Sequence, residues 1–463
     1  MSAISRRALL GRGLGTLAAL QCGWLASLGA GDPPPAGHPL APRSPHFPAK
    51  AKRLVIVFLT GGMSHIDTFD PKPKLASMTG ANAPKRHDGK PQQFRPSDFA
   101  FKKHGKSGIE VSEIFPQLAT TIDDWTVIRS MKGDHGNHFE ATLAMHCGSV
   151  TVPMPSLGAW VSHGLGTMNA NLPSYVVFAK ELPYAGSQVF DASFLPGVHQ
   201  GVRVIPGARP IANLAPASPL AEQDRRLGLL AQLDALHLDA HADRSRLEAR
   251  RLSFATARGM EIDAPQVFDL ARESPAAKAL YGGDQALADP NGFAWQFLMA
   301  RRMLEAGVRT VEVISGGSNR GWDAHGHIVP NHRNRGTEID APLAGFIKDL
   351  RSRGLFEETL IAFCTEFGRS ATSTNLGPLG GREHHPKAFT CLLAGAGVRR
   401  GHVHGATSDT GEEVAADQVH VHDYHATILH LLGFDHTKLT YRYAGRDFRL
   451  TDVHGTVVKG VLA

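Results

Sequence analysis

Six short apolar runs, rich in β-branched and aromatic residues, constrain the fold of this chain more than any other feature. The first, residues 54–59, reads LVIVFL and ends near a Gly-Gly pair, which is typical of a fully buried parallel strand. Helical patterns at 293–305 and 340–353 each precede a later apolar run. The other five apolar runs, which we expect to be strands, lie at 125–128, 174–178, 310–314, 360–363 and 389–394. This alternation predicts an α/β fold with a doubly wound, mostly parallel sheet flanked by helices.

The length and composition fit one large globular domain. The chain has 463 residues, of which 42% are hydrophobic and 20% charged, and we expect the α/β domain to occupy residues 51–463. Residues 218–260 are rich in Leu, Ala, Arg and Asp, with apolar positions at helical spacing. We expect a helical insertion there, and its simplest interpretation is a solvated hairpin.

The N-terminal segment has the features of an export signal. Residues 5–10, SRRALL, resemble a twin-arginine motif, and an apolar run at 14–28 with small residues at 26–30 follows. We therefore expect a signal peptide at 1–31, a disordered linker at 32–50, and a periplasmic or extracellular protein. The apolar run is short and interrupted by glycine, so no membrane span is expected in the mature protein.

Charge and cysteine usage give no support for a nucleic-acid partner or for a cysteine-based site. The formal net charge of +6 falls to +3 once the three arginines of the signal are removed, which gives no reason to expect a nucleic-acid partner. The mature part retains only Cys147, Cys364 and Cys391, and no C-x-x-C pair. A disulfide framework or a cysteine-based zinc site is therefore not expected.

Polar loops that contain His and carboxylate residues follow several of the predicted strands. They lie at 61–70, 133–142, 317–327 and 365–369, with a further segment at 381–386. In a doubly wound sheet, loops at the carboxyl ends of the strands meet at one edge. A set of His and carboxylate ligands with open positions suits Zn²⁺, Mn²⁺ or Fe²⁺. The alternative is that these side chains are ordinary loop residues.

The motifs in these loops resemble a known family. The set GGMSHIDTFDPKP, WDAHG, TEFGRS and EHHP is similar to that of the domain-of-unknown-function 1501 (DUF1501) family, from about Arg53 to the end of the chain. Residues 340–368 also resemble the stretch of sulfatases that delivers metal ligands on a strand, and residues 423–433 resemble a late helix of the same superfamily. The resemblance implies an alkaline phosphatase/sulfatase-like fold and a divalent metal, Zn²⁺ or Mn²⁺ first, with Ca²⁺ or Mg²⁺ as alternatives.

The resemblance also implies a ligand set. Asp323 with His325 or His327 matches a D-x-x-x-H motif, Glu366 stands where the family motif has an Asp, and His385 or His384 matches a later His. One departure is Phe367, which replaces a His ligand. Another is the missing Asp at the end of the first strand, which His65 or Asp67 could replace.

The nucleophile and the anion-binding residues are less well defined. The nucleophile position of the superfamily falls near Asn137 or His138, and no Cys-x-Pro-x-Arg stretch occurs, which disfavours the formylglycine mechanism of sulfatases. Thr142, one helical turn after His138, is an alternative nucleophile, although a structural role is the simpler reading. Arg369 and Arg382 are candidates for gripping a phosphate or sulfate group, or equally for ion pairs with neighbouring acids.

Two functions follow from these features. The first is an exported metal-dependent hydrolase of phosphate or sulfate esters, which uses either water activated by the metal or an unidentified nucleophile. The second is a non-catalytic protein on the same fold, either one that binds sulfated or phosphorylated glycans or a structural protein of the cell envelope. The missing nucleophile favours the second. In both, the partner is a small anionic ester or an anionic glycan.

Overall fold

The protein is built around one large sheet. The computed structural model describes residues 32–34, 36, 38–85, 89–207, 209–216, 218–240, 244–318 and 321–463. The signal expected at 1–31 lies outside these residues, as do Asn319 and Arg320 of one polar loop. The strands of the sheet are β1 (Arg53–Leu59), β6 (Trp125–Lys132), β7 (Tyr175–Phe178), β8 (Val202–Val204), β9 (Thr310–Ser315), β10 (Thr359–Cys364), β14 (Phe389–Gly395), β15 (His402–His404) and β18 (Val419–His420).

The sheet has the order β15-β6-β14-β10-β1-β9-β7-β8, and β18 also pairs with β6. β1 is central and lies parallel to both β10 and β9. β14 runs antiparallel to its neighbours β10 and β6, whereas the other described pairs of this sheet are parallel. The prediction of an α/β fold with a mostly parallel sheet is confirmed.

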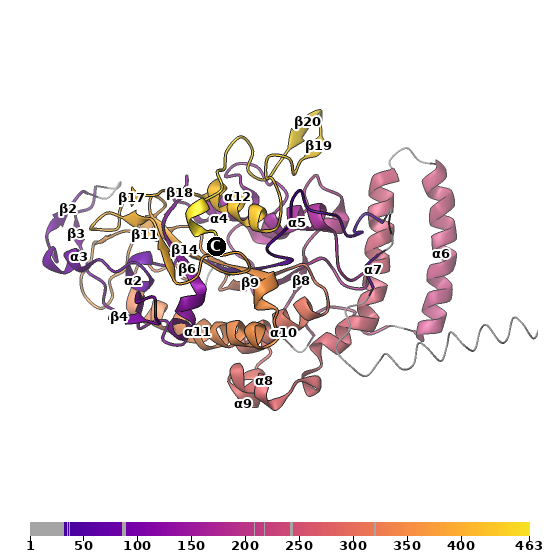
Figure 1. Cartoon of the computed structure of the whole chain (residues 1–463), viewed down its shortest axis with the longest axis horizontal. Helices are drawn as coiled ribbons and strands as arrows, with labels where there is room; N and C mark the ends of the chain where they lie inside the picture. Colours follow the sequence, from indigo (N-terminus) through magenta and orange to yellow (C-terminus); the bar gives the residue numbers. More distant parts are fainter. Residues whose placement is uncertain are drawn as a thin grey trace, which may run out of the picture.

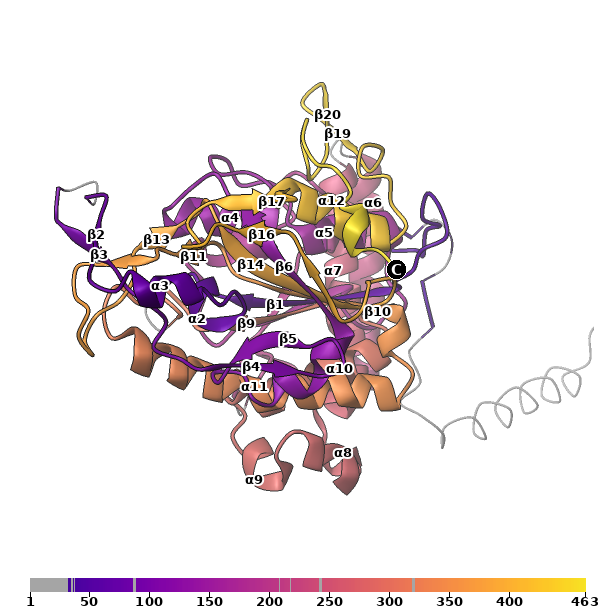
Figure 2. The same ribbon diagram turned by 60° about the vertical axis from the view of Figure 1, so that its left-hand side comes forward.

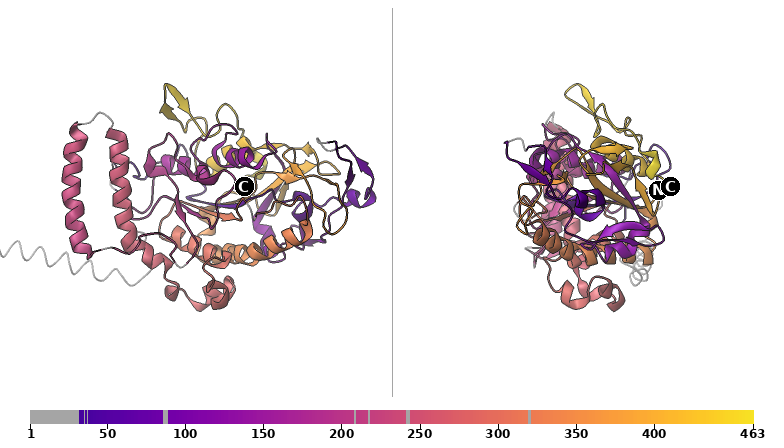
Figure 3. Two further views of the ribbon diagram at one scale, coloured as in Figure 1. Left: turned by 180° about the vertical axis from the view of Figure 1, so that it is seen from behind. Right: turned by 90° about the vertical axis from the view of Figure 1, so that its left-hand side faces the viewer.

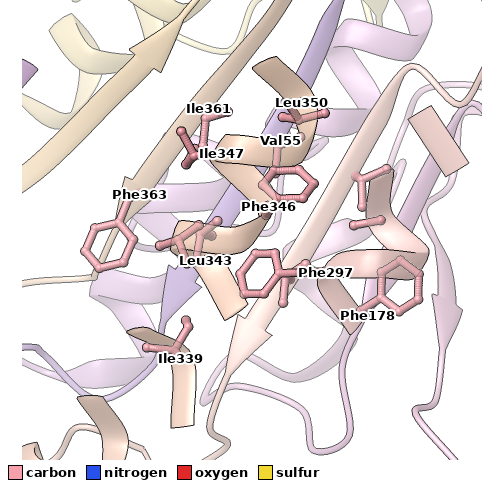
Figure 4. Packing of buried hydrophobic residues seen from close by; sticks show 14 of the residues in the cluster. Val55, Phe178, Phe297, Ile339, Leu343, Phe346, Ile347, Leu350, Ile361 and Phe363 are labelled. Atoms are coloured by element: carbon pink, nitrogen blue, oxygen red, sulfur yellow. The ribbon is translucent and has the colours of Figure 1, made fainter. Parts of the chain in front are cut away.

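Helices cover both faces of the sheet, as the continuous apolar strands require (Figures 1 and 2). Val55 and Val57 of β1 point to the face covered by α10 (Phe293–Glu305) and α11 (Ile328–Ser352). Figure 4 shows this packing, in which residues of α11 lie against Val55 and Phe363. Ile56 and Phe58 point to the opposite face, which carries α4 (His138–Cys147), α5 (Leu157–Leu165) and α12 (Val421–Leu431).

Two helices stand apart from this core. α6 (Leu220–Ala240) and α7 (Arg244–Phe268) form a long antiparallel pair at one end of the molecule, in the segment where a helical insertion is expected (Figure 3). Leu229, Leu233 and Leu236 on α6 are exposed. Within the described residues, none of the helices combines the length and the apolar character needed to cross a membrane.

The segment preceding β1 differs from the expectation. Residues 38–50 are not a disordered linker, because Leu40 is buried and Arg43 donates a hydrogen bond to the His163 carbonyl at 2.7 Å. The backbone N–H groups of Lys50 and Ala51 donate to the Leu431 carbonyl at the end of α12. Apolar and backbone contacts therefore order this Pro-rich segment, whose composition alone suggests disorder.

A small ladder beside the sheet fixes the loops after β10. β11 (Gly368–Arg369) pairs antiparallel with β13 (His384–His385), with Arg369 opposite His384 and Gly368 opposite His385. Gly368 has no room for a side chain, because an added Cβ would lie 2.5 Å from both the Ala388 carbonyl and His65 Nδ1. The ladder therefore holds His384 and His385 in fixed positions at the carboxyl edge of β1 and β10.

Candidate metal centre

Four strands deliver polar side chains to one edge of the sheet. His138 begins α4 after β6, Asp323 and His325 follow β9, and Glu366 follows β10. His384 precedes β14, which is antiparallel and therefore starts at the edge where the parallel strands end. The sequence thus places these residues together through the rule that parallel strands expose their carboxyl ends at a common edge.

The His138 ring is oriented by a buried carboxylate. Its Nδ1 lies 2.7 Å from Glu366 Oε1, and because a carboxylate only accepts, Nδ1 carries the proton of the neutral ring. Its Nε2 is buried without a hydrogen bond and lies 3.3 Å from Asp323 Oδ2. Burial lowers the pKa of His138, but the contacts with Asp323 and Glu366 outweigh burial and raise it. The same two carboxylates favour any cation at Nε2.

His384 and His325 meet through ring nitrogens that both carry lone pairs. His384 Nδ1 donates to the Gly136 carbonyl at 2.8 Å, and His325 Nδ1 lies 3.0 Å from Glu383 Oε2. With both protons on Nδ1, each neutral ring presents a lone pair at Nε2. The two Nε2 atoms are 2.9 Å apart. Two facing lone pairs repel at this distance, so the arrangement is satisfied either by a proton shared between the two rings or by a metal ion beside them.

Asp323 is the acidic centre of this group. Its Oδ1 accepts from Arg369 Nη2 at 2.7 Å and lies 3.5 Å from the Nε2 atoms of both His325 and His384. Burial raises the pKa of the Asp323 carboxyl, but its contacts with His138, His384 and Arg369 hold it far below its usual range. Asp323 is therefore ionised at every pH at which the protein is expected to work.

These residues fit a metal such as Zn²⁺. Ligand atoms of His138, Asp323 and His384 all lie within 4.8 Å of one another, and His325 Nε2 adjoins them. Imidazole nitrogens and one carboxylate are ordinary ligands for Zn²⁺, and Mn²⁺ also accepts them. Each ring has an oxygen acceptor on its other nitrogen, as ligating histidines usually do. The unpartnered Nε2 of His138 and the facing Nε2 pair are the observations that a cation would satisfy.

Glu366, expected to be a ligand, lies behind His138. Its Oε1 accepts from the Gly61 N–H at 2.7 Å as well as from His138, and its Oε2 accepts from the Thr365 hydroxyl at 3.2 Å. It is therefore placed to orient His138 and to join the end of β1 to α4. Phe367, the departure noted in the sequence, packs against the rings of both His138 and His384, at centroid distances of 4.7 and 4.6 Å, and these two rings are themselves 4.2 Å apart.

Tyr184 is a site residue that sequence reasoning missed. Its ring stacks on that of His138, with centroids 4.0 Å apart and an interplanar angle of 5°, and its hydroxyl donates to Asp323 Oδ2 at 3.3 Å. Burial and the negative charge of Asp323 and Glu366 raise the pKa of Tyr184. No motif marks this tyrosine, because it lies in an irregular segment after β7 and reaches the site only through the fold.

Neither candidate anion-binding arginine points to open space. Arg369 is fully buried and donates to the carbonyls of Gly61, Gly62 (2.9 Å) and Arg382 (3.1 Å) in addition to Asp323. Arg382 is also buried and forms an ion pair with Asp67 at 2.8 Å, with further bonds to the carbonyls of Arg95, Pro96 and Ser370. Each guanidinium group thus forms an ion pair with an acid and also joins neighbouring loops.

The remaining candidates lie outside the group of converging ring nitrogens. His65 Nε2 bonds the Gly411 carbonyl, and burial lowers its pKa to about 4. His385 Nε2 bonds the Glu412 carbonyl at 2.6 Å. His327 is exposed and begins α11 with a positive φ of 55°. Thr142 is buried in the interface between α4 and the sheet.

A second histidine cluster has a different protonation pattern. Asp134, His420 and His422 also have ligand atoms within 4.8 Å of one another. However, His420 Nδ1 accepts from the His422 N–H at 3.3 Å and caps α12, so its Nε2 carries the proton that is shared with Asp134 Oδ1 at 3.0 Å. Both ring nitrogens of His420 are thus engaged, whereas His422 Nδ1 is buried without a hydrogen bond.

The fold and the site define an α/β protein with a His-and-carboxylate centre at the carboxyl edge of its sheet. The chain belongs to the DUF1501 family, "Protein of unknown function", whose model matches residues 51–462. The resemblance noted in the sequence is therefore confirmed at the level of the family. No curated protein matches the chain.

Several solved structures are similar to the chain. The lipoteichoic acid synthase LtaP from Listeria monocytogenes has 9% identity and a TM-score of 0.38, covering 91% of this chain and 79% of that one. The PsFucS1 sulfatase from Pseudoalteromonas sp. has 12% identity and a TM-score of 0.37, covering 89% and 72%. A protein in the alkaline phosphatase superfamily from Vibrio parahaemolyticus has 11% identity and a TM-score of 0.35, covering 87% and 72%. At these scores the similarity carries no conclusion about function.

Proposed function

We propose that this protein is a metal-dependent hydrolase of phosphate or sulfate esters, with His138, Asp323 and His384 as metal ligands and His325 as a fourth. The facing Nε2 atoms of His325 and His384, 2.9 Å apart with an oxygen acceptor near each Nδ1, are the observation that carries the proposal. Zn²⁺ or Mn²⁺ would supply Lewis acidity for the ester oxygens and would lower the pKa of water, so that hydroxide would be available as the nucleophile. Ca²⁺ and Mg²⁺ fit less well, because they prefer oxygen ligands.

The side chains around the centre have separate roles in this proposal. Glu366 orients the His138 ring through a hydrogen bond, and the buried Arg369 fixes the Asp323 carboxylate in the same way. Tyr184, whose raised pKa keeps its hydroxyl protonated, could redirect its hydrogen bond from Asp323 to an anionic oxygen of the substrate. It borders a cavity of about 260 Å³ that Asp323, Asn331, Asn334 and Arg335 also line. A polar cavity against Asp323 suits the alcohol part of an anionic ester.

A binding protein for anionic glycans is the second candidate. The absence of an evident nucleophile favours it: the Thr142 hydroxyl is buried, and His138 is committed to Glu366 and Asp323. The same centre would then hold a sulfated or phosphorylated saccharide without turnover. In both candidates we place the protein outside the cytoplasm, on the basis of its twin-arginine-like N-terminal sequence.

Metal content and turnover test both candidates. Protein purified without chelator should contain about one equivalent of Zn²⁺ or Mn²⁺ by elemental analysis and should hydrolyse chromogenic phosphate or sulfate esters. The variant His384→Asn should lose the metal. Its matched control is His385→Asn, since His385 bonds the Glu412 carbonyl instead. Metal retained by His384→Asn would contradict the site, whereas metal and glycan binding without turnover would favour the second candidate.

A further inference from the structure

Two histidines of α4, one near each end of the helix, contact buried carboxylates. His138, Thr142 and His146 recur at intervals of four, so they share one face of α4, and that face lies against the sheet. His146 Nε2 lies 2.8 Å from Glu312 Oε1, and its Nδ1 lies 2.8 Å from the Thr142 carbonyl. α4 is thus attached to buried glutamates at both ends.

Glu312 occupies a place where an apolar residue is expected. It lies in the middle of β9, between Val311 and Val313, and is fully buried. The Tyr175 hydroxyl donates to its Oε2, and His146 contacts its Oε1. A buried ion pair is weak evidence for stability, because an apolar pair of similar volume often serves as well, and its best-attested use is to fix register. Glu312 makes no contact with the metal centre itself.

We propose that Glu312 and His146 are positioning residues that fix α4 against the sheet and thereby aim His138 Nε2 at the metal. This inference rests on the proposed function, which assigns His138 as a ligand. Glu312 on β9 and Glu366 after β10 lie on opposite sides of β1, since β1 pairs with both strands. The His146 ring also packs edge-on against Phe58 of β1, at a centroid distance of 4.4 Å.

Two attachments eight residues apart fix the rotation and tilt of α4, whereas a single attachment leaves both free. The Glu366–His138 bond alone lets the helix pivot about its first residue. A second bond two turns along, about 12 Å away at 1.5 Å per residue, removes both rotation about the helix axis and tilt relative to the strands. Metal ligands must be held to within about 0.5 Å, so a small rotation of α4 would move Nε2 out of range.

The test compares metal affinity with stability. Co²⁺ is titrated into the metal-free full chain and followed by its visible spectrum, for wild type, Glu312→Gln and His146→Gln. We expect the Co²⁺ dissociation constant to rise about 10- to 100-fold with an altered spectrum, as when a second shell is lost. Met145→Ala is the matched control, because Met145 is a buried residue of α4 outside this network. It should lower the urea midpoint and leave the dissociation constant unchanged.

A second readout separates this inference from the proposed function. The imidazole ¹⁵N resonances of His138 in metal-free protein report its Nδ1 bond to Glu366 and should shift in Glu312→Gln but not in Met145→Ala. Unchanged Co²⁺ affinity, spectrum and His138 resonances in folded Glu312→Gln and His146→Gln would overturn the inference. Absence of Co²⁺ binding by wild type would overturn the metal centre, while the resonances would still decide whether Glu312 positions His138. If Glu312→Gln does not fold, Tyr175→Phe loosens the same carboxylate more gently.

Discussion

His325 and His384 face each other through Nε2 atoms 2.9 Å apart; His384 donates its other ring proton to the Gly136 carbonyl, and His325 Nδ1 lies 3.0 Å from Glu383 Oε2. A neutral pair with this geometry repels, whereas a shared cation makes it favourable. The charge of the site therefore depends on what it binds. The guanidinium group of Arg369, which donates a hydrogen bond to Asp323, already offsets the negative charge of that carboxylate.

Metal binding should stabilise the folded protein in a way that depends on this centre. At a free metal concentration 100 times the dissociation constant, the gain is about 2.7 kcal/mol. Thermal unfolding with Zn²⁺ and with chelator measures it. The gain should disappear in His384→Asn and persist in His385→Asn, and equal stabilisation of both variants would place the metal elsewhere.

Glu366→Gln should weaken metal binding without removing a ligand. The amide is uncharged, so it favours a cation at His138 less and no longer fixes the ring tautomer as strongly. We expect a 10- to 100-fold loss of affinity in a competition assay with a metal-sensitive dye. If Glu366 instead ligates the metal directly, the ligand count from X-ray absorption would fall by one in the variant.

Arg382→Met should damage folding and leave metal binding intact. The substitution strands the buried Asp67 carboxylate, whose pKa is lowered to about 2, against the pull of burial, mainly by Arg382. Breaking a buried pair in this way costs about 3–5 kcal/mol in unfolding free energy. Urea denaturation measures the loss, and the double variant Arg382→Met/Asp67→Leu should recover part of it. A normal stability with a raised KM would show that Arg382 binds substrate after all.

Acid should destabilise the protein through buried neutral histidines. Burial lowers the pKa of His332 and of His425 to about 3. The unfolded chain therefore binds more protons than the folded chain between about pH 6.5 and 3, and stability falls as pH falls through this range. Each histidine contributes about 1.4 kcal/mol per pH unit. The free energy of unfolding, measured with urea at pH 7, 6 and 5, should fall less steeply with falling pH in His425→Gln than in wild type. An identical pH dependence in the two proteins would refute this assignment.

The sequence predicted the sheet and the edge at which the polar loops meet, because buried strands and their carboxyl ends follow from local patterns. It did not predict which neighbouring residue points inward. His384 and His385 are adjacent in β13, and successive strand residues face opposite sides, so only the pairing with β11 decides that His384 reaches Asp323. Tyr184 and the place of Glu366 behind His138 depend on contacts between segments far apart in sequence, which no local pattern contains.

The two-residue ladder between β11 and β13 has a consequence for how this family can vary. We expect changes of length in the loop at 374–379 to leave the pairing of Arg369 with His384 intact. A one-residue shift between Arg382 and Pro386 would exchange His384 for His385 at the centre and turn the ligand outward. Within the family, insertions should therefore occur in the loop at 374–379 and be absent between Arg382 and Pro386. The spacing of these residues should be retained together with the residues themselves.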